Sequence, residues 1–214
     1  MEKTVLLELH YLPSIQYVSK LLQYPKVMLE QHENYSKGSY RNRCHLASSM
    51  GLLRLSLPLA GGKNQQQPIR EVKLKYDESW QNQHWTAIKS AYGKSPYLEH
   101  YEHLFLPIFQ KKYEFLWDWN WDLLQVILEI ISLGKNIELT KEFEKELSGK
   151  IVDFRNKISP KENRKFEDAD FEQVKYVQVF EAENGFLPNL SILDLIFCAG
   201  PEAVIYLERS LKIE

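Results

Sequence analysis

The sequence lacks the features that identify several common classes of protein. Its two cysteines, Cys44 and Cys198, are too few and too far apart for a disulfide framework or a zinc ribbon. It contains no GxGxxG, Walker, HExxH, CxxC or GxSxG motif, which disfavours the nucleotide and zinc enzymes that carry such motifs. We therefore expect no cofactor. We also expect no metal, because His100 and His103 form a pair without a third ligand in view.

Long apolar runs are also missing. The most apolar segment, residues 117–133, is interrupted by three carboxylates and two amides, and is too polar to cross a bilayer. The first ten residues lack the apolar stretch and small-residue cleavage site of a signal peptide. Free thiols fit a reducing compartment. We expect a cytoplasmic protein without membrane insertion.

A large excess of charge of one sign is absent as well. The chain carries 27 Lys and Arg against 29 Asp and Glu, a net charge of −2, with both signs mixed along the sequence. Nucleic acids and anionic membranes bind to broad basic surfaces, so neither is an expected partner. A small anionic ligand needs only a local basic patch, and it remains the expected partner. The oligomeric state is left open.

What is present predicts an α/β protein. Of the 214 residues, 44% are hydrophobic, which is enough for a substantial core, and we expect a single domain over residues 1–214. Apolar patterns and turn residues predict a strand, a helix and a parallel strand at residues 4–9, 14–23 and 26–29. Residues 44–48 and 52–59 read as a hairpin, and residues 72–76 as a further strand of a mixed sheet. The sheet part covers residues 1–76, and residues 77–214 are mainly helical.

Three other segments receive simpler interpretations. Trp117, Trp119 and Trp121 are expected to pack in the core rather than stack on a ligand. The polar loop at residues 61–68 is either a lid or an exposed connection. Residues 140–172 are rich in charged side chains, and we expect exposed, mobile structure with little chemistry there.

The polar stretch from Glu30 to Arg43 is the most promising candidate site. Arg41 and Arg43 present forks of N–H groups that suit a phosphate or a carboxylate, and Glu30 and Glu33 could transfer protons. In open α/β sheets ligands bind beyond the carboxyl ends of the strands, where His10-Tyr11 and the residues Glu30, His32 and Glu33 both fall. An ion-paired connection between strands would account for the same residues.

Two further candidates lie on predicted helices. His84 shares an apolar helix face with Trp80 and Ile88, which indicates a buried histidine satisfied by a backbone carbonyl, with a catalytic role as the alternative. Asp194 lies in an apolar helix and needs a partner. An arginine of the loop between Tyr35 and Arg43 is the expected partner of Asp194.

Four groups of residues form a recognisable pattern: Tyr11-Leu12-Pro13 with Tyr17; Tyr35, Lys37 and Ser39-Tyr40-Arg41-Asn42-Arg43; His84-Trp85, Ile88, Ala91-Tyr92 and Ser95-Pro96-Tyr97; and Leu190-Ser191-Ile192-Leu193-Asp194-Leu195-Ile196 with Gly200. Together they resemble the WbqC-like family, and the match spans nearly the whole chain. The chain looks like the shorter form of the family that occurs in Bacteroides-type bacteria.

The resemblance implies a place in surface-polysaccharide or aminosugar metabolism. Some members are suggested to attach an amino acid or another acyl group to a sugar amine. Many relatives carry His-Gln-Pro-Asn-Tyr-Leu-Pro where this chain reads Leu7-Glu8-Leu9-His10-Tyr11-Leu12-Pro13, and paired aspartates where it has Gln31-His32. If those groups are catalytic in relatives, the chemistry of this chain differs.

Our leading hypothesis is an acyl or aminoacyl transferase that acts on a nucleotide-linked sugar. Expected catalytic residues, which would deprotonate the sugar amine, are Glu30, Glu33, His10 and His84. Expected substrate-binding residues are Arg41, Arg43 and Lys37 for the anionic group, Asn42 for orientation, Tyr11 and Tyr40 for stacking, and Tyr92 and Asp194. One alternative is a non-catalytic binding or assembly protein with a structural arginine–carboxylate network. Another is a relation to the HIGH-type nucleotidyltransferases, by analogy with a strand that ends in a His and Pro turn.

Overall fold

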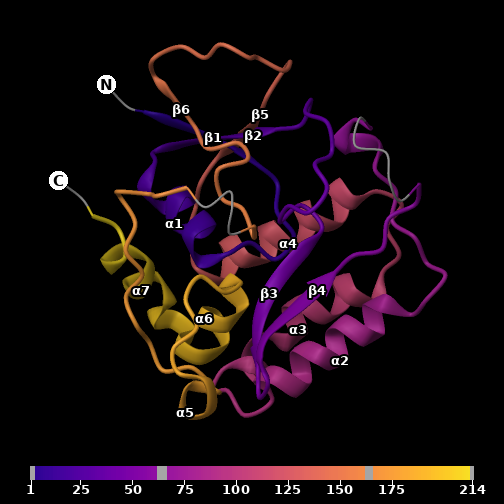
Figure 1. Ribbon diagram of the computed structural model, residues 1–214, viewed down its shortest axis with the longest axis vertical. Helices are drawn as coiled ribbons and strands as arrows, with labels where there is room; N and C mark the ends of the chain where they lie inside the picture. Colours follow the sequence, from indigo (N-terminus) through magenta and orange to yellow (C-terminus); the bar gives the residue numbers. More distant parts are fainter. Residues whose placement is uncertain (1–2, 62–66, 162–165, 213–214) are drawn as a thin grey trace.

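The computed structural model describes residues 3–61, 67–161 and 166–212. Figure 1 shows a sheet at one end, helices below it on both sides, and a long hairpin between the two groups of helices. The elements in chain order are β1 (Thr4–Glu8), α1 (Ile15–Gln23), β2 (Lys26–Glu30), β3 (Arg43–Ser48), β4 (Gly51–Ser56), η1 (Ile69–Glu71), α2 (Trp80–Tyr92), α3 (Leu98–Gln110), α4 (Leu116–Ile130), β5 (Ile137–Leu139), β6 (Ile151–Asp153), α5 (Glu181–Asn184), α6 (Ile192–Ala199), η3 (Gly200–Glu202) and α7 (Ala203–Arg209).

The larger sheet is parallel and has the strand order β5-β2-β1-β6. The predicted strand–helix–strand unit is confirmed, because β1 and β2 pair in parallel around α1. Ser14 caps α1 by accepting a hydrogen bond from the backbone N–H of Tyr17, and Pro13 precedes it. In this register Glu8 lies directly beside Glu30 at the carboxyl ends of the two central strands. Two carboxylates are thus brought together at the edge where the sequence predicts a site.

The hairpin β3–β4 forms a second, antiparallel sheet. Parallel and antiparallel pairing both occur, as predicted, but in separate sheets. Gly51 has a φ of 96°, a conformation that favours glycine, and it lets the chain reverse after Met50. The register pairs His45 with Arg54 and Ala47 with Leu52. Because side chains alternate along a strand, Arg43 lies on the same face of the hairpin as His45.

The second half of the chain is mainly helical, as predicted. Trp119 on α4 is fully buried, and its ring lies 4.9 Å from Trp80 and 5.2 Å from Phe109, measured between ring centroids. These edge-to-face contacts tie α4 to α2 and α3, so this tryptophan packs in the core, as expected. The start of α6 returns to the start of α1, where Ile15 N–H donates to the carbonyl of Leu190. The C-terminal helices are therefore fixed beside the N-terminal unit.

Two expectations about the fold need correction. Residues 72–76 do not form a strand: Leu74 bridges Leu59 and Lys73 bridges Phe115, each at a single position. The segment is shared between two neighbours, and Pro58 on one of them has no N–H to donate to a ladder. The segment 140–172 is also more ordered than expected, because β6 lies within it and pairs with β1. Most of the loop at residues 61–68 lies outside the described residues.

Within the described ranges, no helix combines the length and the apolar character that crossing a membrane requires.

Candidate functional site

A cluster of ionisable side chains lies at the carboxyl ends of β1 and β2. The Glu8 carboxylate accepts a hydrogen bond from the His10 ring at 3.1 Å and one from the backbone N–H of Asn156 at 2.9 Å. Arg41 lies 3.5 Å from the same carboxylate and binds Glu33 in a bidentate manner, with N–O distances of 2.7 and 2.5 Å. The structure therefore brings together three residues that the sequence singles out, His10, Glu33 and Arg41.

Burial and charge set the protonation of this cluster. Arg41 is fully buried, and the adjacent carboxylates raise its pKa. Burial alone would favour a protonated Glu8, but Arg41 and the hydrogen bonds from His10 and Asn156 outweigh it and lower the pKa of Glu8 to about 2. Burial raises the pKa of Glu33 to about 7, in spite of Arg41 and with the help of the charges on Glu8 and Glu30. Burial also lowers the pKa of His10, which favours the neutral ring.

Glu30 belongs to a neighbouring network. Its carboxylate accepts hydrogen bonds from Arg155 at 2.9 Å, from the hydroxyl of Thr140 at 2.8 Å and from the backbone N–H of His32 at 2.8 Å. Arg155 also binds Asp153 at the end of β6. The segment at residues 140–172, in which we expected little chemistry, thus supplies partners to Glu30, and Asn156 reaches Glu8 and Arg41.

His84 and Tyr11 lie apart from these clusters. The Tyr11 hydroxyl and Nδ1 of His84 are 2.9 Å apart, and both side chains are buried. Burial lowers the pKa of His84 to about 4, although a hydrogen bond with the backbone of Ser56 opposes this. His84 is therefore a satisfied core histidine, with a tyrosine as an additional partner.

Asp194 is not paired with an arginine, contrary to our expectation. It accepts hydrogen bonds from the hydroxyls of Tyr92 and Tyr176, at 2.9 and 2.5 Å, and from the amide of Gln178 at 3.1 Å. The start of α6 packs among these neutral donors, while the arginines of the Tyr35–Arg43 loop lie elsewhere. Burial raises the pKa of Asp194 and the three hydrogen bonds oppose that shift, so Tyr92 and Asp194 form an interior network.

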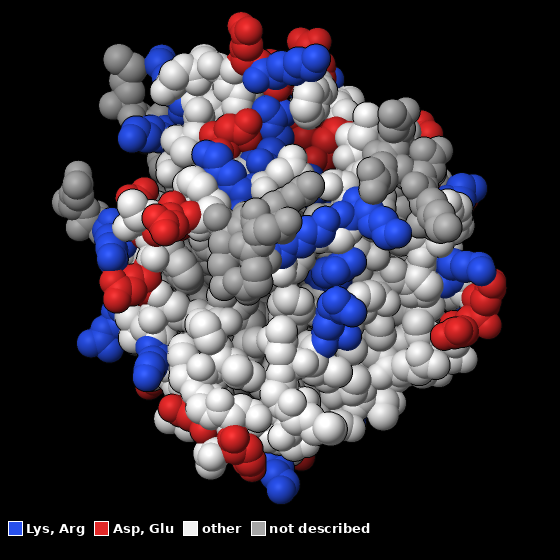
Figure 2. Space-filling view, in the orientation of Figure 1, with Lys and Arg blue, Asp and Glu red and all other residues white. Residues whose placement is uncertain are grey.

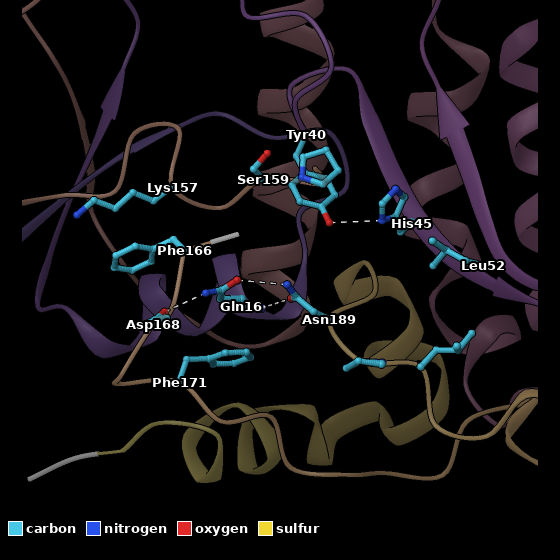
Figure 3. A pocket seen from close by; sticks show the side chains of 13 residues that line it. Gln16, Tyr40, His45, Leu52, Lys157, Ser159, Phe166, Asp168, Phe171 and Asn189 are labelled. Carbon is cyan, nitrogen blue, oxygen red and sulfur yellow. Dashed lines mark hydrogen bonds between the residues drawn. The ribbon is translucent and has the colours of Figure 1, made fainter. Parts of the chain in front are cut away.

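A cavity of about 500 Å³ opens beside the hairpin (Figure 3). Tyr40, His45 and Leu52 line one side of it, and Gln16, Asn189 and Asp168 line another (Figure 3). The remaining lining residues are Lys157, Ser159, Pro160, Phe166, Phe171, Leu187 and Pro188. Of the predicted site residues, only Tyr40 lines this cavity. Its ring centroid lies 5.5 Å from that of His10, so Tyr40 separates the buried cluster from the cavity.

The hairpin face next to the cavity carries uncompensated positive charge. Arg43 and Arg54 make no ion pair with any other residue that the structure describes, and the Nε of Arg43 is buried without a hydrogen-bond partner there. Each lowers the pKa of His45, as does burial of the ring, so the imidazole favours its neutral form. Figure 2 shows Lys and Arg side chains gathered over the hairpin, while the Asp and Glu side chains in view lie farther out.

Arg54 and His45 are the residues that our sequence analysis did not select. The hairpin turn at Met50-Gly51 fixes a register in which they are directly opposite each other, and counting back from that turn would have paired them. The predicted residues Lys37 and Asn42 have different surroundings. Lys37 is exposed, while the Asn42 amide donates to the carbonyl of Leu57 and closes the open end of the hairpin.

Within the described ranges, no three His, Cys, Asp or Glu side chains are grouped so that they could hold a metal ion.

The comparisons with known proteins give one relative and one family. Over 227 aligned residues, the chain is 23% identical to the uncharacterized protein Rv1507c of Mycobacterium tuberculosis (strain ATCC 25618 / H37Rv), with 97% of this chain and 98% of that protein covered. No solved structure matches the chain. The model of the WbqC-like protein family matches residues 9–206, which include the strand-end cluster apart from Glu8, the hairpin and the start of α6. This chain therefore belongs to the WbqC-like protein family.

Proposed function

We propose that this protein is an acyl or aminoacyl transferase of aminosugar or surface-polysaccharide metabolism, and that its substrate is a nucleotide-linked sugar bound in the cavity beside the hairpin. The observation that carries the proposal is the pair Arg43 and Arg54, two arginines on one hairpin face with no carboxylate partner among the described residues. Family membership supports the metabolic context, and the chemistry of the cavity supports the substrate class.

An anionic group fits the hairpin face because like charges are costly when they are left together. Partial burial and, to a smaller extent, the charge of Arg54 lower the pKa of Arg43. A diphosphate placed between the two guanidinium groups would replace this repulsion with charge-assisted hydrogen bonds. Arg41, to which we also gave this role, is bound by Glu33 instead, so in the proposal Arg43 and Arg54 hold the diphosphate.

His45 is suited to accept the proton of the sugar amine. It lines the cavity, and its lowered pKa keeps the imidazole neutral near pH 7, as a general base requires. In the proposed step the amine nitrogen attacks the carbonyl carbon of an activated acyl donor, and a C–N bond forms. The bond to the donor's leaving group then breaks, the leaving group takes the electron pair, and His45 takes the proton of the amine.

The buried cluster contacts the residues that line the cavity through Tyr40. The His10 ring stacks near Tyr17, with centroids 4.4 Å apart, and near Tyr40, whose hydroxyl lies 3.4 Å from Nδ1 of His45. Glu8, which lies beside Arg41, binds the His10 ring and so fixes its position. The predicted catalytic roles of Glu30, Glu33, His10 and His84 stay predictions, and the proposal gives proton transfer to His45 because these four side chains are buried and do not line the cavity.

A thermal-shift screen with nucleotide sugars, nucleoside diphosphates and acyl donors tests the proposal. A ligand at 100 times its dissociation constant stabilises the folded protein by about 2.7 kcal/mol, which raises the midpoint by several degrees. We expect a shift with at least one nucleotide sugar, abolished in Arg54→Ala and retained in the matched control Arg70→Ala. Arg70 pairs with Asp118 on an exposed surface. If no nucleotide sugar shifts the wild-type midpoint, the proposal is wrong.

A second candidate function is a non-catalytic binding or assembly protein. The bidentate pair between Arg41 and Glu33, buried at the strand ends, is the arginine–carboxylate network that this alternative expects. The two candidates differ in turnover. Incubation of the protein with the ligand found in the screen and an acyl donor, followed by mass spectrometry, would yield an acylated sugar only if the protein is a transferase.

A further inference from the structure

The cavity has a second polar wall, formed by Gln16, Asp168 and Asn189 (Figure 3). The Gln16 amide donates to Asp168 at 3.1 Å, and the Asn189 amide donates to the Gln16 side-chain oxygen at 3.2 Å. The backbone N–H of Gln16 donates to the Asn189 side-chain oxygen at 3.0 Å. Neither the acyl-transfer step nor the diphosphate contacts proposed above use this wall.

The side chains of the wall have fixed orientations because neighbouring groups bind them. Gln16 lies in the first turn of α1, and Asn189 has a φ of 52°, in the left-handed region that asparagine tolerates. The Asp168 carboxylate is held by Lys20, whose fully buried ammonium group lies 2.8 Å from one oxygen and 2.9 Å from the other. A ligand therefore meets side chains whose orientation is already fixed.

The hydrogen-bonding capacity that remains on this wall suits hydroxyl groups. A primary amide has two N–H donors, and Gln16 and Asn189 each use one of theirs within the wall. Lys20 neutralises Asp168, so the wall is polar but has no net charge. Because a hydroxyl both donates and accepts, it can bond to a free N–H and to a carboxylate lone pair. A phosphate, which only accepts, matches the wall poorly.

An aromatic surface lies beside these polar groups. Phe166 and Phe171 line the cavity on either side of Asp168 in Figure 3. The faces of a sugar ring are made of C–H groups, which pack on aromatic rings, while its edge carries the hydroxyls. Polar side chains next to aromatic rings therefore match both surfaces of a sugar.

We propose that the wall of Gln16, Asp168 and Asn189 binds the sugar ring of the nucleotide-linked substrate, while Arg43 and Arg54 bind its diphosphate. This inference rests on the proposed function and adds the orientation of the substrate. The sugar then lies between the wall and His45, within reach of the proposed base. The nucleoside lies on the other side of the diphosphate, away from the wall.

Titration calorimetry with matched ligands tests this orientation. The probes are UDP-glucose, UDP-N-acetylglucosamine, dTDP-glucose and GDP-mannose, each compared with its free nucleoside diphosphate. Gln16→Ala removes one wall donor and keeps a good helix former at that position of α1. Asn189→Asp replaces the N–H donors with an oxygen of similar shape, and aspartate also tolerates a left-handed φ. Gln83→Ala, on an exposed position of α2, is the matched control.

We expect Gln16→Ala and Asn189→Asp to weaken nucleotide-sugar binding by about fivefold, as expected for one lost hydrogen bond, while binding of the nucleoside diphosphates stays unchanged. Gln83→Ala leaves both unchanged. Equal weakening of a nucleotide sugar and its diphosphate would overturn the inference, because the wall would then contact the nucleoside. Unchanged binding of both ligands in both variants would overturn it as well. If the wild type binds no ligand of either class, the proposed function fails, and this inference fails with it.

Discussion

The buried site of Arg41 and the hairpin face with Arg43 and Arg54 differ in almost every physical respect. Arg41 is buried and has carboxylate partners, Glu33 in a bidentate pair and Glu8 at 3.5 Å. Arg43 is two residues away, and with Arg54 it makes no ion pair in the described part of the chain. A buried charge without a partner is strongly destabilising, whereas a partly exposed charge keeps contact with water.

This contrast separates structural residues from candidate binding residues. The Arg-Asn-Arg sequence suggests one anion-binding fork, but Arg41 lies in the turn before β3 and is buried against Glu33, whereas Arg43 begins β3 and lies on the hairpin face. The buried arginine holds two strand ends together. The positive charges of Arg43 and Arg54 are available to bind an anionic ligand. Four measurements test whether the two sites differ in this way.

The largest expected effect is that of Arg41→Ala on stability. The substitution leaves the buried carboxylates of Glu33 and Glu8 without their cation, and we expect a loss of about 3–5 kcal/mol in the free energy of unfolding. Arg54→Ala should change it by no more than about 0.5 kcal/mol, because no ion pair is lost. Urea unfolding of both variants measures the difference. Equal losses in the two variants would contradict the division into a structural and a binding arginine.

A smaller loss is expected for Arg155→Ala, at the neighbouring strand end. Glu30 loses a charged hydrogen bond but keeps those from Thr140 and from the backbone of His32, so we expect a cost of about 2 kcal/mol. The control is Lys73→Ala, since Lys73 pairs with Glu114 where both side chains are more than half exposed, at 54% and 62%. The control should cost less than about 1 kcal/mol. A stability of Arg155→Ala equal to that of the control would show that Glu30 needs no cation.

A change in salt concentration should affect ligand binding at the hairpin face moderately and the buried Arg41 pair very little. Between about 0.01 and 1 M ionic strength the screening length falls from about 30 to 3 Å, which weakens the interactions of exposed charges far more than those of buried pairs. We expect the affinity for a nucleotide sugar to fall severalfold by calorimetry. The stability difference between the wild type and Arg41→Ala should change little over the same range. An affinity independent of salt would exclude the hairpin face as the diphosphate site.

The smallest expected effect is on the pH profile of acyl transfer. Burial and the charges of Arg54 and Arg43 lower the pKa of His45 from 6.5. The base is active when it is unprotonated, so the acidic limb of kcat/KM should lie below pH 6.5. It should disappear from the much slower His45→Gln variant. A limb near pH 7 that persists in His45→Gln would point instead to Glu33, whose pKa is raised to about 7.

The elements of the fold were largely predictable because they depend on local pattern. The apolar residues of α1 recur at helical spacing, Ser14 caps the helix, and the strands on either side are apolar and pair in parallel as expected. One exception was residues 72–76, where an apolar alternation predicts a strand but neighbours on two sides offer only one bridge each. The sequence of the segment does not show how many neighbouring segments are available to pair with it.

The candidate site was predictable only in part. The positions of the strand ends placed His10, Glu30 and Glu33 at one edge of the sheet, and there the structure has His10 bound to Glu8 and Glu30 directly beside Glu8. The cavity is built from residues as distant as Gln16 and Asn189, which no local pattern connects. The partner of Asp194 was predicted incorrectly for the same reason, since Tyr92 and Tyr176 reach it from other parts of the chain.

The sequence is enough to predict most of the strands and helices, the family resemblance and the charged groups at one edge of the sheet. Only the folded chain shows which arginine is buried and which lies on the hairpin face, because that depends on the hairpin register and on the return of residues 153–156 to the strand ends. The physical reason is that burial and pairing of a charge involve residues more than a hundred positions apart, such as Glu30 and Arg155. Only the folded chain brings such residues within reach of each other.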